Sequence, residues 1–524
     1  MRGKQCTFEF NSVEIKEVEK LLRSISKDNS TGTDCIDGKL LRIAVDYIAL
    51  PVCHIFNSCL SNGTCPKIWK EEKIIPIPKD TKSTFSGPNC RPITILPVLS
   101  NILERIVYNQ IHDYMSKNDL ISNTQHAYRE GHSTCTALVK MTDDWLRGID
   151  NSLLSGAVML DFSAAFDLID HKLLIEKLTH YGFGPMAISW FENYLSFRTQ
   201  QVFLNGTLSN SINIDCGVPQ GSCLGPLLFS IFTNDLPLVI QESTFVLYAD
   251  DSTLYYSAST CCKLKSVLSH DLKAGVNWVT ANRLVLNLSK TVSIVFGSRH
   301  NVASQPMLDL QISSQPVKQE SKLKLLGLSI CNTLSWTDHV RQIVAKMSRS
   351  IATVRKCATY LPATLQRQVV QTLVLCHLDY CSVIWASASK TDLSKLQTVQ
   401  NRAARLVLDR SYRSNVDQMH SDLKWPKALD RLSIRSLIFI KNVISTHVPR
   451  ALFNEIGFCS DAHSYGTRSA TAGLVVLPHC RSNAMRRTSF YRSISLWNIL
   501  PSHIRVIPVK REFKRQIKSY FYLC

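Results

Sequence analysis

The spacing of apolar residues changes along the chain and divides it into regions. Residues 1–150 mix helical periods with a stretch punctuated by prolines, which exclude helix between residues 76 and 97. Residues 151–335 alternate short apolar runs with helical periods, and this alternation indicates a sheet covered by helices. From about residue 336 the period becomes helical.

Individual elements can be predicted within the middle region. The run "GAVMLDF" (156–162) predicts a buried strand, and "HKLLIEKLTHYG" predicts a helix that ends at Gly182. The stretch "CGVPQGSCLGPLLFSIFTNDL" predicts a loop that leads into a helix, with Ser222 near the cap and Pro226 in its first turn. The stretch "TFVLYADDSTLYYSAS" (244–259) predicts two strands around a tight turn. Next come a helix and the strand "KTVSIVFG", and the apolar face of that helix comprises Leu264, Val267, Leu268, Leu272 and Val279.

The helical part that follows carries one apolar stripe, formed by Val340, Ile343, Val344, Met347, Ile351 and Val354. Arg349, Arg355 and Lys356 lie off this stripe; such a basic face is usually only solvated, but it would also suit a duplex backbone. Residues 411–524 are basic, and their pattern indicates only a general affinity for phosphate.

Composition narrows the class of protein. The chain has 524 residues, long enough for several domains, and its 45% hydrophobic content excludes a mainly disordered protein. Sixty Lys and Arg against 41 Asp and Glu give a net charge of +19, which suits nucleic acid or an anionic membrane surface. No apolar run is long enough to span a bilayer, and "MRGKQCTFEF" lacks a signal-peptide core, so we expect a soluble intracellular protein that is not secreted.

The cysteines do not suggest a disulfide framework or a zinc site. There are 18, scattered along the chain, and the groups "CHIFNSC" and "CHLDYC" lack a second half at zinc-finger spacing. We therefore expect free thiols and assign no zinc.

Three acids carry the candidate chemistry. Asp250 and Asp251 are adjacent in the predicted turn, and alone they would suit an ordinary hairpin tip. Asp161 ends the other apolar strand, so all three acids emerge on one sheet edge if the two strands are neighbours. Crowded carboxylates favour a divalent cation, and two Mg²⁺ ions about 3.5–4 Å apart can drive in-line phosphoryl transfer.

A series of ordered blocks carries a family resemblance. The chain resembles the reverse transcriptases of non-LTR (LINE-type) retrotransposons over residues 25–335, and "LQTVQNRAARLV" and "SLWNILPSHIR" resemble the end of such polyproteins. The blocks, in order, are "RPITILPVLSNILERIV", "QHAYREGHSTCTAL", "AVMLDFSAAFDLIDHKLL", "GVPQGSCLGPLLFSIFTNDLP", "LYADDSTLYY", "LVLNLSKTVSIVFG" and "LKLLGLSI".

The resemblance implies roles for residues around the acids. Asp161, the backbone carbonyl of Phe162, Asp250 and Asp251 correspond to the metal ligands, and the three acids to the catalytic residues. Phe166 corresponds to the steric gate against a ribose 2′-OH; the alternative is a plain core aromatic.

Further positions correspond to nucleotide contacts in that family. Pro219, Gln220 and Gly221 resemble the loop that contacts the incoming nucleotide and the template, although an ordinary loop before a helix remains the alternative. Lys79 and Arg91 resemble residues that face the triphosphate; isolated cations are otherwise solvated surface charges.

Two later blocks correspond to the leaving group and the primer. Lys290 resembles the lysine that protonates the leaving pyrophosphate. Leu326 and Gly327 resemble the primer grip, for which the alternative is a plain buried strand.

The family implies an α+β right-hand polymerase with a mostly antiparallel palm sheet packed on helices. The expected divisions are an N-terminal extension and fingers (1–150), a palm (151–335), a helical thumb (336–410) and a basic C-terminal region (411–524), with the reverse transcriptase domain at about 70–335. The implied activity is RNA-directed DNA polymerisation with two Mg²⁺ ions, for which Mn²⁺ can substitute. The implied partners are an RNA template, a DNA primer or target DNA and deoxynucleoside triphosphates, without a membrane, in the nucleus and cytoplasm.

Other interpretations remain open at this point. Related elements carry an upstream endonuclease domain, which we expect this chain to lack, as a truncated copy or one reading frame of a longer product would. A remnant that binds nucleic acid without turnover is the main alternative, although a pure binder has no need of all three acids. A nuclease or phosphatase would leave the nucleotide-contact blocks unexplained.

Overall fold

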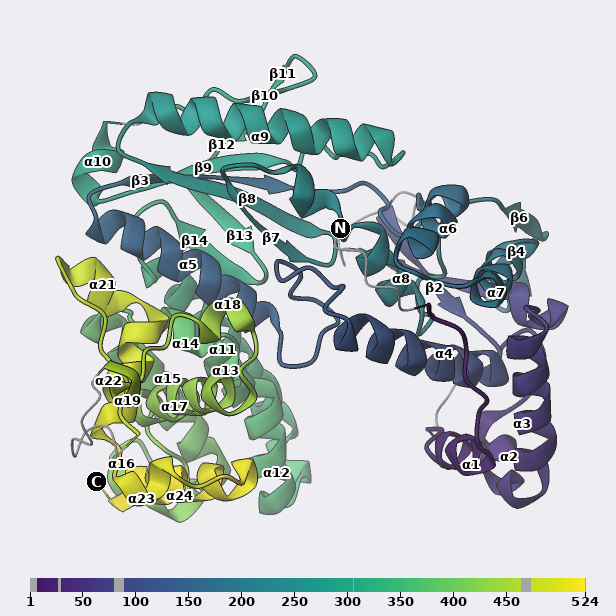
Figure 1. Ribbon diagram of the computed structural model, residues 1–524. Coiled ribbons are helices and arrows are strands. Elements are labelled where there is room, and N and C mark those ends of the chain that lie inside the picture. The colour runs from purple at the N-terminus through teal and green to yellow at the C-terminus, as the bar shows by residue number, and fades with distance from the viewer. Residues whose placement is uncertain (1–6, 27–29, 80–88, 305, 463–472, 524) are drawn as a thin grey trace. The chain divides into compact units, whose positions relative to one another are not determined.

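The computed structural model describes residues 7–26, 30–79, 89–304, 306–462 and 473–523 (Figure 1). Part of the proline-punctuated stretch (80–88) and part of the basic C-terminal region (463–472) lie outside the described residues. The chain divides into two compact units: unit 1 comprises 1–128, 161–241 and 273–287, and unit 2 comprises 129–160, 242–272 and 288–524.

Unit 1 is built around a five-stranded sheet. Its main path runs β2-β1-β4-β5, and β6 also pairs with β4. The strands are β1 (Glu71–Pro78), β2 (Cys90–Ile95), β4 (Arg198–Leu204), β5 (Thr207–Leu208) and β6 (Ile212–Ile214). The helices include α1 (Ile15–Arg23), α2 (Gly38–Ile43), α3 (Val45–Ser61), α4 (Val98–Lys117), α6 (His171–His180), α7 (Pro185–Leu195) and α8 (Gly225–Phe232).

Proline placement explains the extended part of unit 1. Pro76 and Pro78 lie in β1, Pro92 lies in β2, and α4 begins only after its N-cap, Pro97. Between residues 76 and 97 the described residues contain no α-helix, as predicted, because proline removes a backbone donor and clashes with the preceding turn.

Unit 2 contains the second sheet, in the order β12-β9-β3-β8-β7. Only β12 pairs with its neighbour in parallel; the other pairings are antiparallel, which confirms the expected sheet class. The strands are β12 (Lys318–Gln319), β9 (Val292–Phe296), β3 (Leu154–Leu160), β8 (Asp251–Ala258) and β7 (Thr244–Tyr248).

Helices cover both faces of this sheet (Figure 1). Helix α9 (Cys261–Ala281), whose residues 261–272 belong to unit 2, packs through Leu268, which a Cβ at Gly156 would meet at 2.7 Å. Helix α5 (Thr134–Asp150) lies on the opposite face, where Trp145 stacks on Phe296 at 4.1 Å between ring centroids. The predicted apolar face of α9 is buried along its length.

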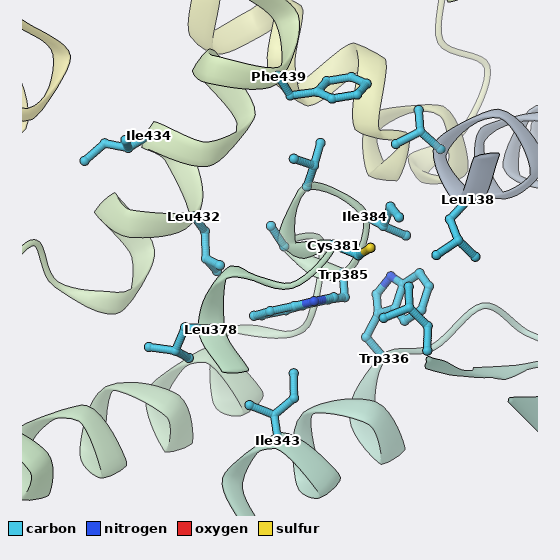
Figure 2. Close-up of a cluster of buried hydrophobic side chains, with 14 of the residues drawn as sticks. Leu138, Trp336, Ile343, Leu378, Cys381, Ile384, Trp385, Leu432, Ile434 and Phe439 are labelled. Carbon is cyan, nitrogen blue, oxygen red and sulfur yellow. The ribbon is translucent and has the colours of Figure 1, made fainter. Parts of the chain in front are cut away.

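The helical remainder of unit 2 forms one core (Figure 2). It comprises α11 (Thr337–Cys357), α15 (Lys390–Leu408), α16 (Val416–Leu423), α17 (Ala428–Thr446), α22 (Ser489–Ile499) and α24 (Lys510–Leu523), with shorter helices between them. The predicted stripe of α11 is buried except for half-buried Val344. Trp385 and Phe439 both belong to this core (Figure 2), and residues 336–410 and 411–524 both lie in unit 2.

The units therefore cross the divisions expected from the sequence. Residues 129–150 belong to unit 2 because α5 packs on its sheet, and Asp143 of α5 accepts hydrogen bonds from the backbone N–H of Ser489 and Phe490. These bonds satisfy the first turn of α22 from a residue far away in sequence.

Two general properties concern the described residues only. No helix among them has both the length and the apolar composition that crossing a bilayer requires. Their cysteines are free thiols.

Candidate functional site

The acidic pair lies on a hairpin of unit 2. Strands β7 and β8 are joined by a two-residue turn, Ala249–Asp250, and Tyr248 pairs with Asp251 across it, as predicted. Ala249 has a left-handed backbone (φ +56°), which an L-residue adopts only under strain. Both acids are exposed, while the flanking strand residues are buried and hold the turn in place.

The register of β3 places its end beside this hairpin. Leu160, the last residue of β3, pairs with Ser252, the residue after the acidic pair. Asp161 is the next residue in the chain, so its Cα lies about 3.8 Å from that of Leu160. Strand β3, which precedes Asp161, and strand β8, which begins at Asp251, are therefore neighbours in the sheet of unit 2.

Asp161 is itself held by unit 1. Its carbonyl accepts a hydrogen bond from the N–H of Asn287 at 2.8 Å, and Phe162, which is buried, forms an antiparallel bridge with Leu286. Within the described ranges, no three His, Cys, Asp or Glu side chains form a group that could hold a metal ion. Mg²⁺ commonly takes one or two carboxylates in proteins, with waters and substrate phosphates as its other ligands.

The "GVPQG" loop of unit 1 requires both of its glycines. Gly217 has φ +86°, and a Cβ there would lie 2.7 Å from the carbonyl oxygen of Asp167. Gly221 has φ +127°, and a Cβ there would lie 2.6 Å from the carbonyl oxygen of Thr94. Only glycine fits such close backbone approaches at positive φ. The loop then enters α8 as predicted, since Ser222 Oγ accepts a hydrogen bond from the N–H of Gly225 and Pro226 lies in the first turn.

Gln220 is fixed at both its backbone and its side chain. Its carbonyl accepts the N–H of Thr94 at 2.7 Å, and its Nε2 donates to both carboxylate oxygens of Asp167 at 2.8 and 2.9 Å. Burial raises the pKa of Asp167, and the Gln220 hydrogen bond and the Lys79 charge partly oppose this effect. Asp167 is not among the residues predicted from the sequence, although it directly follows Phe166 in the block "DFSAAFD".

This loop borders a cavity of about 670 Å³ that lies wholly within unit 1. Lys79, Asp167, Pro219 and Gln220 are among its lining residues, together with side chains of β1, β2 and β4. Arg91 is exposed on β2, paired with Ile77, and does not line this cavity. The structure thus brings Lys79 and Gln220 to one cavity, whose lining does not include Arg91.

A buried charge cluster supports the cavity wall. Arg198 Nε donates to Glu72 at 2.7 Å, and Tyr194 donates to Glu104 at 2.7 Å. Glu104 also accepts the N–H of Cys223 at 2.7 Å, directly after the glycine loop. Burial raises the pKa of both glutamates, although Arg198 lowers that of Glu72. No sequence signal could have identified this cluster, because its members are far apart along the chain.

Phe166 is half-buried beside the same loop. Its ring stacks on Phe229 at 4.8 Å between centroids, and its carbonyl accepts the N–H of Val218 at 2.8 Å. These contacts fix the ring in place, and they are compatible with a gate as well as with a core aromatic.

The remaining predicted residues lie in turns of unit 2. Lys290 is exposed in the turn before β9. Leu326 and Gly327 form a two-residue turn between β13 (Lys322–Leu325) and β14 (Leu328–Cys331), with φ +43° and +84°. The alternative of a plain strand at this position is wrong, since both residues have left-handed backbones. Tyr380 donates its hydroxyl to the carbonyl of Leu326 at 2.7 Å.

Comparison with known proteins gives a consistent result. A family model described as "Reverse transcriptase (RNA-dependent DNA polymerase)" matches residues 77–330. The probable RNA-directed DNA polymerase from transposon BS of Drosophila melanogaster is 28% identical, over 82% of this chain and 48% of that protein. The RNA-directed DNA polymerase from mobile element jockey of the same species is 27% identical, over 86% of this chain and 50% of that protein.

A more distant relative extends the comparison. The Retrovirus-related Pol polyprotein from type-1 retrotransposable element R1 of Bradysia coprophila is 22% identical, over 81% of this chain and 42% of that protein. The chain spans about half the length of the first two relatives. Its mixed sheets and helices have the right-hand polymerase fold that the family model implies. Residues 77–330 thus match a reverse transcriptase domain, and the chain is similar over most of its length to RNA-directed DNA polymerases of non-LTR (LINE-type) retrotransposons.

Proposed function

We propose that this protein is an RNA-directed DNA polymerase that extends a primer 3′-OH on an RNA template by two-metal phosphoryl transfer. The observation that carries the proposal is the strand register, in which the end of β3 lies beside the hairpin that bears Asp250 and Asp251. The relative from transposon BS is named a probable RNA-directed DNA polymerase, and the relative from mobile element jockey is named an RNA-directed DNA polymerase.

The proposed metal ligands are the carboxylates of Asp161, Asp250 and Asp251 and the carbonyl of Phe162. This set consists entirely of hard oxygen donors, which suits Mg²⁺ or Mn²⁺ and excludes a thiolate-type site. When bound, such ions lower the pKa of the attacking hydroxyl and stabilise charge on the leaving oxygen. The exposure of Asp250 and Asp251 leaves the carboxylates open to substrate phosphates.

The residues of unit 1 would bind and select the nucleotide. Gln220 is held by Asp167 and Thr94, and it would contact the nucleotide or template together with Pro219 and Gly221. Lys79, on the same cavity, and exposed Arg91 would face the triphosphate.

Three further roles concern the sugar, the leaving group and the primer. The Phe166 ring would exclude a 2′-OH. Lys290 would donate a proton to pyrophosphate, and the Leu326–Gly327 turn would contact the primer. The partners proposed are an RNA template, a DNA primer or target DNA and deoxynucleoside triphosphates, in the nucleus and cytoplasm.

The basic face of α11 is proposed as a contact for the template–primer duplex. Arg349, Arg355 and Lys356 are exposed on α11, away from its buried stripe. Cations on one helix face can bind a phosphate backbone without reading its sequence. The residues of α11 and its neighbours would then form the thumb.

Primer extension by the purified full chain on an RNA template, with Mg²⁺ and deoxynucleotides, tests the proposal. The wild type should extend the primer, whereas Asp250→Asn should not. Asp113→Asn removes an equally exposed acid from α4 and should leave extension unchanged.

The competing function, a binder without turnover, makes a different prediction in the same assay. It requires that the wild type bind primer–template with normal affinity and extend nothing. That result would overturn the polymerase proposal and leave the sequence similarity to reverse transcriptases unexplained by activity.

A further inference from the structure

The last helix of unit 2 carries an unusual row of cations. Residues 411–524 contain 18 Lys and Arg against 6 Asp and Glu. In α24, Lys510, Lys514 and Lys518 follow one another at four-residue spacing, so they lie on one face of the helix. Arg511 and Arg515 form a second row beside them. Phe513 and Ile517 of the same helix are buried and fix it in the core.

Acidic residues of α24 do not neutralise the positive charge of Lys510, Lys514 and Lys518. Glu512 is the only acid of α24, and it pairs with Arg515 at 2.8 Å. Lys510, Lys514 and Lys518 take part in none of the salt bridges among the described residues. Burial lowers the pKa of Lys514, and the nearby charges of Lys510, Arg435 and Lys518 lower it further. Like charges at this spacing destabilise a helix, so the row lowers the stability of α24.

The row leads to an aromatic pocket. Tyr522 is the next residue at four-residue spacing after Lys518, is 40% exposed and donates its hydroxyl to the carbonyl of Lys424. Tyr522 and Lys424 line a pocket of about 740 Å³, together with Trp425, Tyr520 and Ile499. All of these residues belong to unit 2.

The two acids that line this pocket, Asp417 and Asp430, do not make it negatively charged. Asp417 is paired with Lys427 at 2.7 Å, and Asp430 is half-buried, with a pKa that burial raises and Lys427 lowers. Arg367 and Arg431 also act electrostatically on the Tyr522 hydroxyl. The ligand that fits is a polyanion that also carries flat aromatic groups.

We propose that α24 and its pocket bind single-stranded RNA or DNA, with phosphates along Lys510, Lys514 and Lys518 and one unstacked base against Tyr522. Single-stranded sites combine a basic track with aromatic surfaces, because a base without a partner can leave the stack. A duplex offers phosphates but no free base face. This site is additional to the polymerase chemistry and does not depend on it.

The test measures binding of the full chain to three labelled probes: a 12-nucleotide RNA, the same sequence as single-stranded DNA, and the corresponding duplex. Lys514→Gln/Lys518→Gln should weaken single-strand binding about tenfold at 0.15 M salt and reduce the log–log salt slope by about 1.4. Lys263→Gln/Lys390→Gln removes two exposed cations from other helices and should change neither quantity.

The pocket is tested separately. Tyr522→Leu should weaken single-strand binding about tenfold and leave duplex binding unchanged, whereas Tyr522→Phe, which keeps the ring, should bind normally. An RNA containing 4-thiouridine should crosslink to residues 420–427 or 520–522. Unchanged binding by the α24 and Tyr522→Leu variants, or crosslinks only elsewhere, would overturn the proposal.

Two controls distinguish loss of single-strand binding from loss of folding and from loss of polymerase activity. The melting temperature of Lys514→Gln/Lys518→Gln should stay equal or rise, because like-charge repulsion is removed. Primer extension at saturating primer–template should be unaffected by the α24 variants, so loss of this site and loss of polymerase activity are distinguishable.

Discussion

At the residue scale, the Phe166 side chain packs against its neighbours and is also proposed to select deoxynucleotides over ribonucleotides. Its ring stacks on Phe229, and its carbonyl holds the loop that leads to Gln220. Phe166→Val should raise incorporation of ribonucleotides relative to deoxynucleotides, because the smaller side chain leaves room for the 2′-OH. Phe166→Tyr, which keeps the ring, should discriminate as the wild type does. Unchanged discrimination in the valine variant, measured by competing nucleotides, would make Phe166 a core aromatic only.

His339 is a second residue whose environment has a measurable consequence. It is 6% exposed, and its Nδ1 accepts the N–H of Ser329 at 3.3 Å. Burial lowers its pKa from 6.5 to about 4, and the charge of Lys346 adds to this effect. Protonation of Nδ1 would also remove the acceptor of the Ser329 N–H, so this hydrogen bond would be lost.

The sign of the resulting pH dependence follows from this lowered pKa. Between pH 6.5 and about 4 the unfolded chain binds this proton more tightly than the folded chain does. The contribution of His339 to the free energy of unfolding is therefore fully present above pH 6.5 and is lost as the pH falls below 6.5. Between pH 7.5 and pH 5.0 the free energy of unfolding of the wild type should fall by about 2 kcal/mol more than that of His339→Asn, because each pH unit below 6.5 contributes about 1.4 kcal/mol. Urea unfolding at both pH values measures this, with His180→Asn, at an exposed position, as the control. Equal pH dependence of wild type and His339→Asn would refute the assignment.

At the element scale, the glycine loop shows how close backbone packing positions a side chain. Gly221→Ala would place a Cβ 2.6 Å from the Thr94 carbonyl and displace Gln220. Nucleotide incorporation should fall about 100-fold, the usual cost of misplacing a reactive group by about 1 Å. Gly206 also has a positive φ (+83°), but an added Cβ there would meet nothing within 4 Å, so the Gly206→Ala variant should polymerise normally. Equal losses in the two variants would show that strain alone, and not the close approach, matters.

Elements were predictable where a local pattern carries the information. The β7–β8 hairpin, the start of α8 and the apolar face of α9 follow from strand alternation, capping residues and helical period. The "DFSAAFD" block showed Phe166 but not the Asp167–Gln220 bond, because that bond joins residues 53 positions apart. The Glu72–Arg198 pair was unpredictable for the same reason, with 126 positions between its members.

At the scale of the whole molecule, long-range capping decides which segments fold together. Asp143 binds the start of α22 across 346 positions, and Asp150 binds the N–H of Ser482 at 2.6 Å across 332 positions. A linear division of the sequence therefore assigns α5 and the C-terminal region to separate parts, whereas both belong to unit 2. The C-terminal region is thus structural as well as basic, and its deletion should unfold unit 2.

The proposed polymerase chemistry requires Asp161 and Asp250 to act together as metal ligands in nucleotide transfer. The most direct test is the single-turnover rate of adding one deoxynucleotide to a primer on RNA, for wild type, Asp161→Asn, Asp250→Asn and the double variant, at equal primer–template occupancy. Each single change should lower the rate at least about 1,000-fold, and the double variant should be no slower, as groups that act together behave. Single variants near the wild-type rate, or losses that multiply in the double variant, would show that the two acids do not act together.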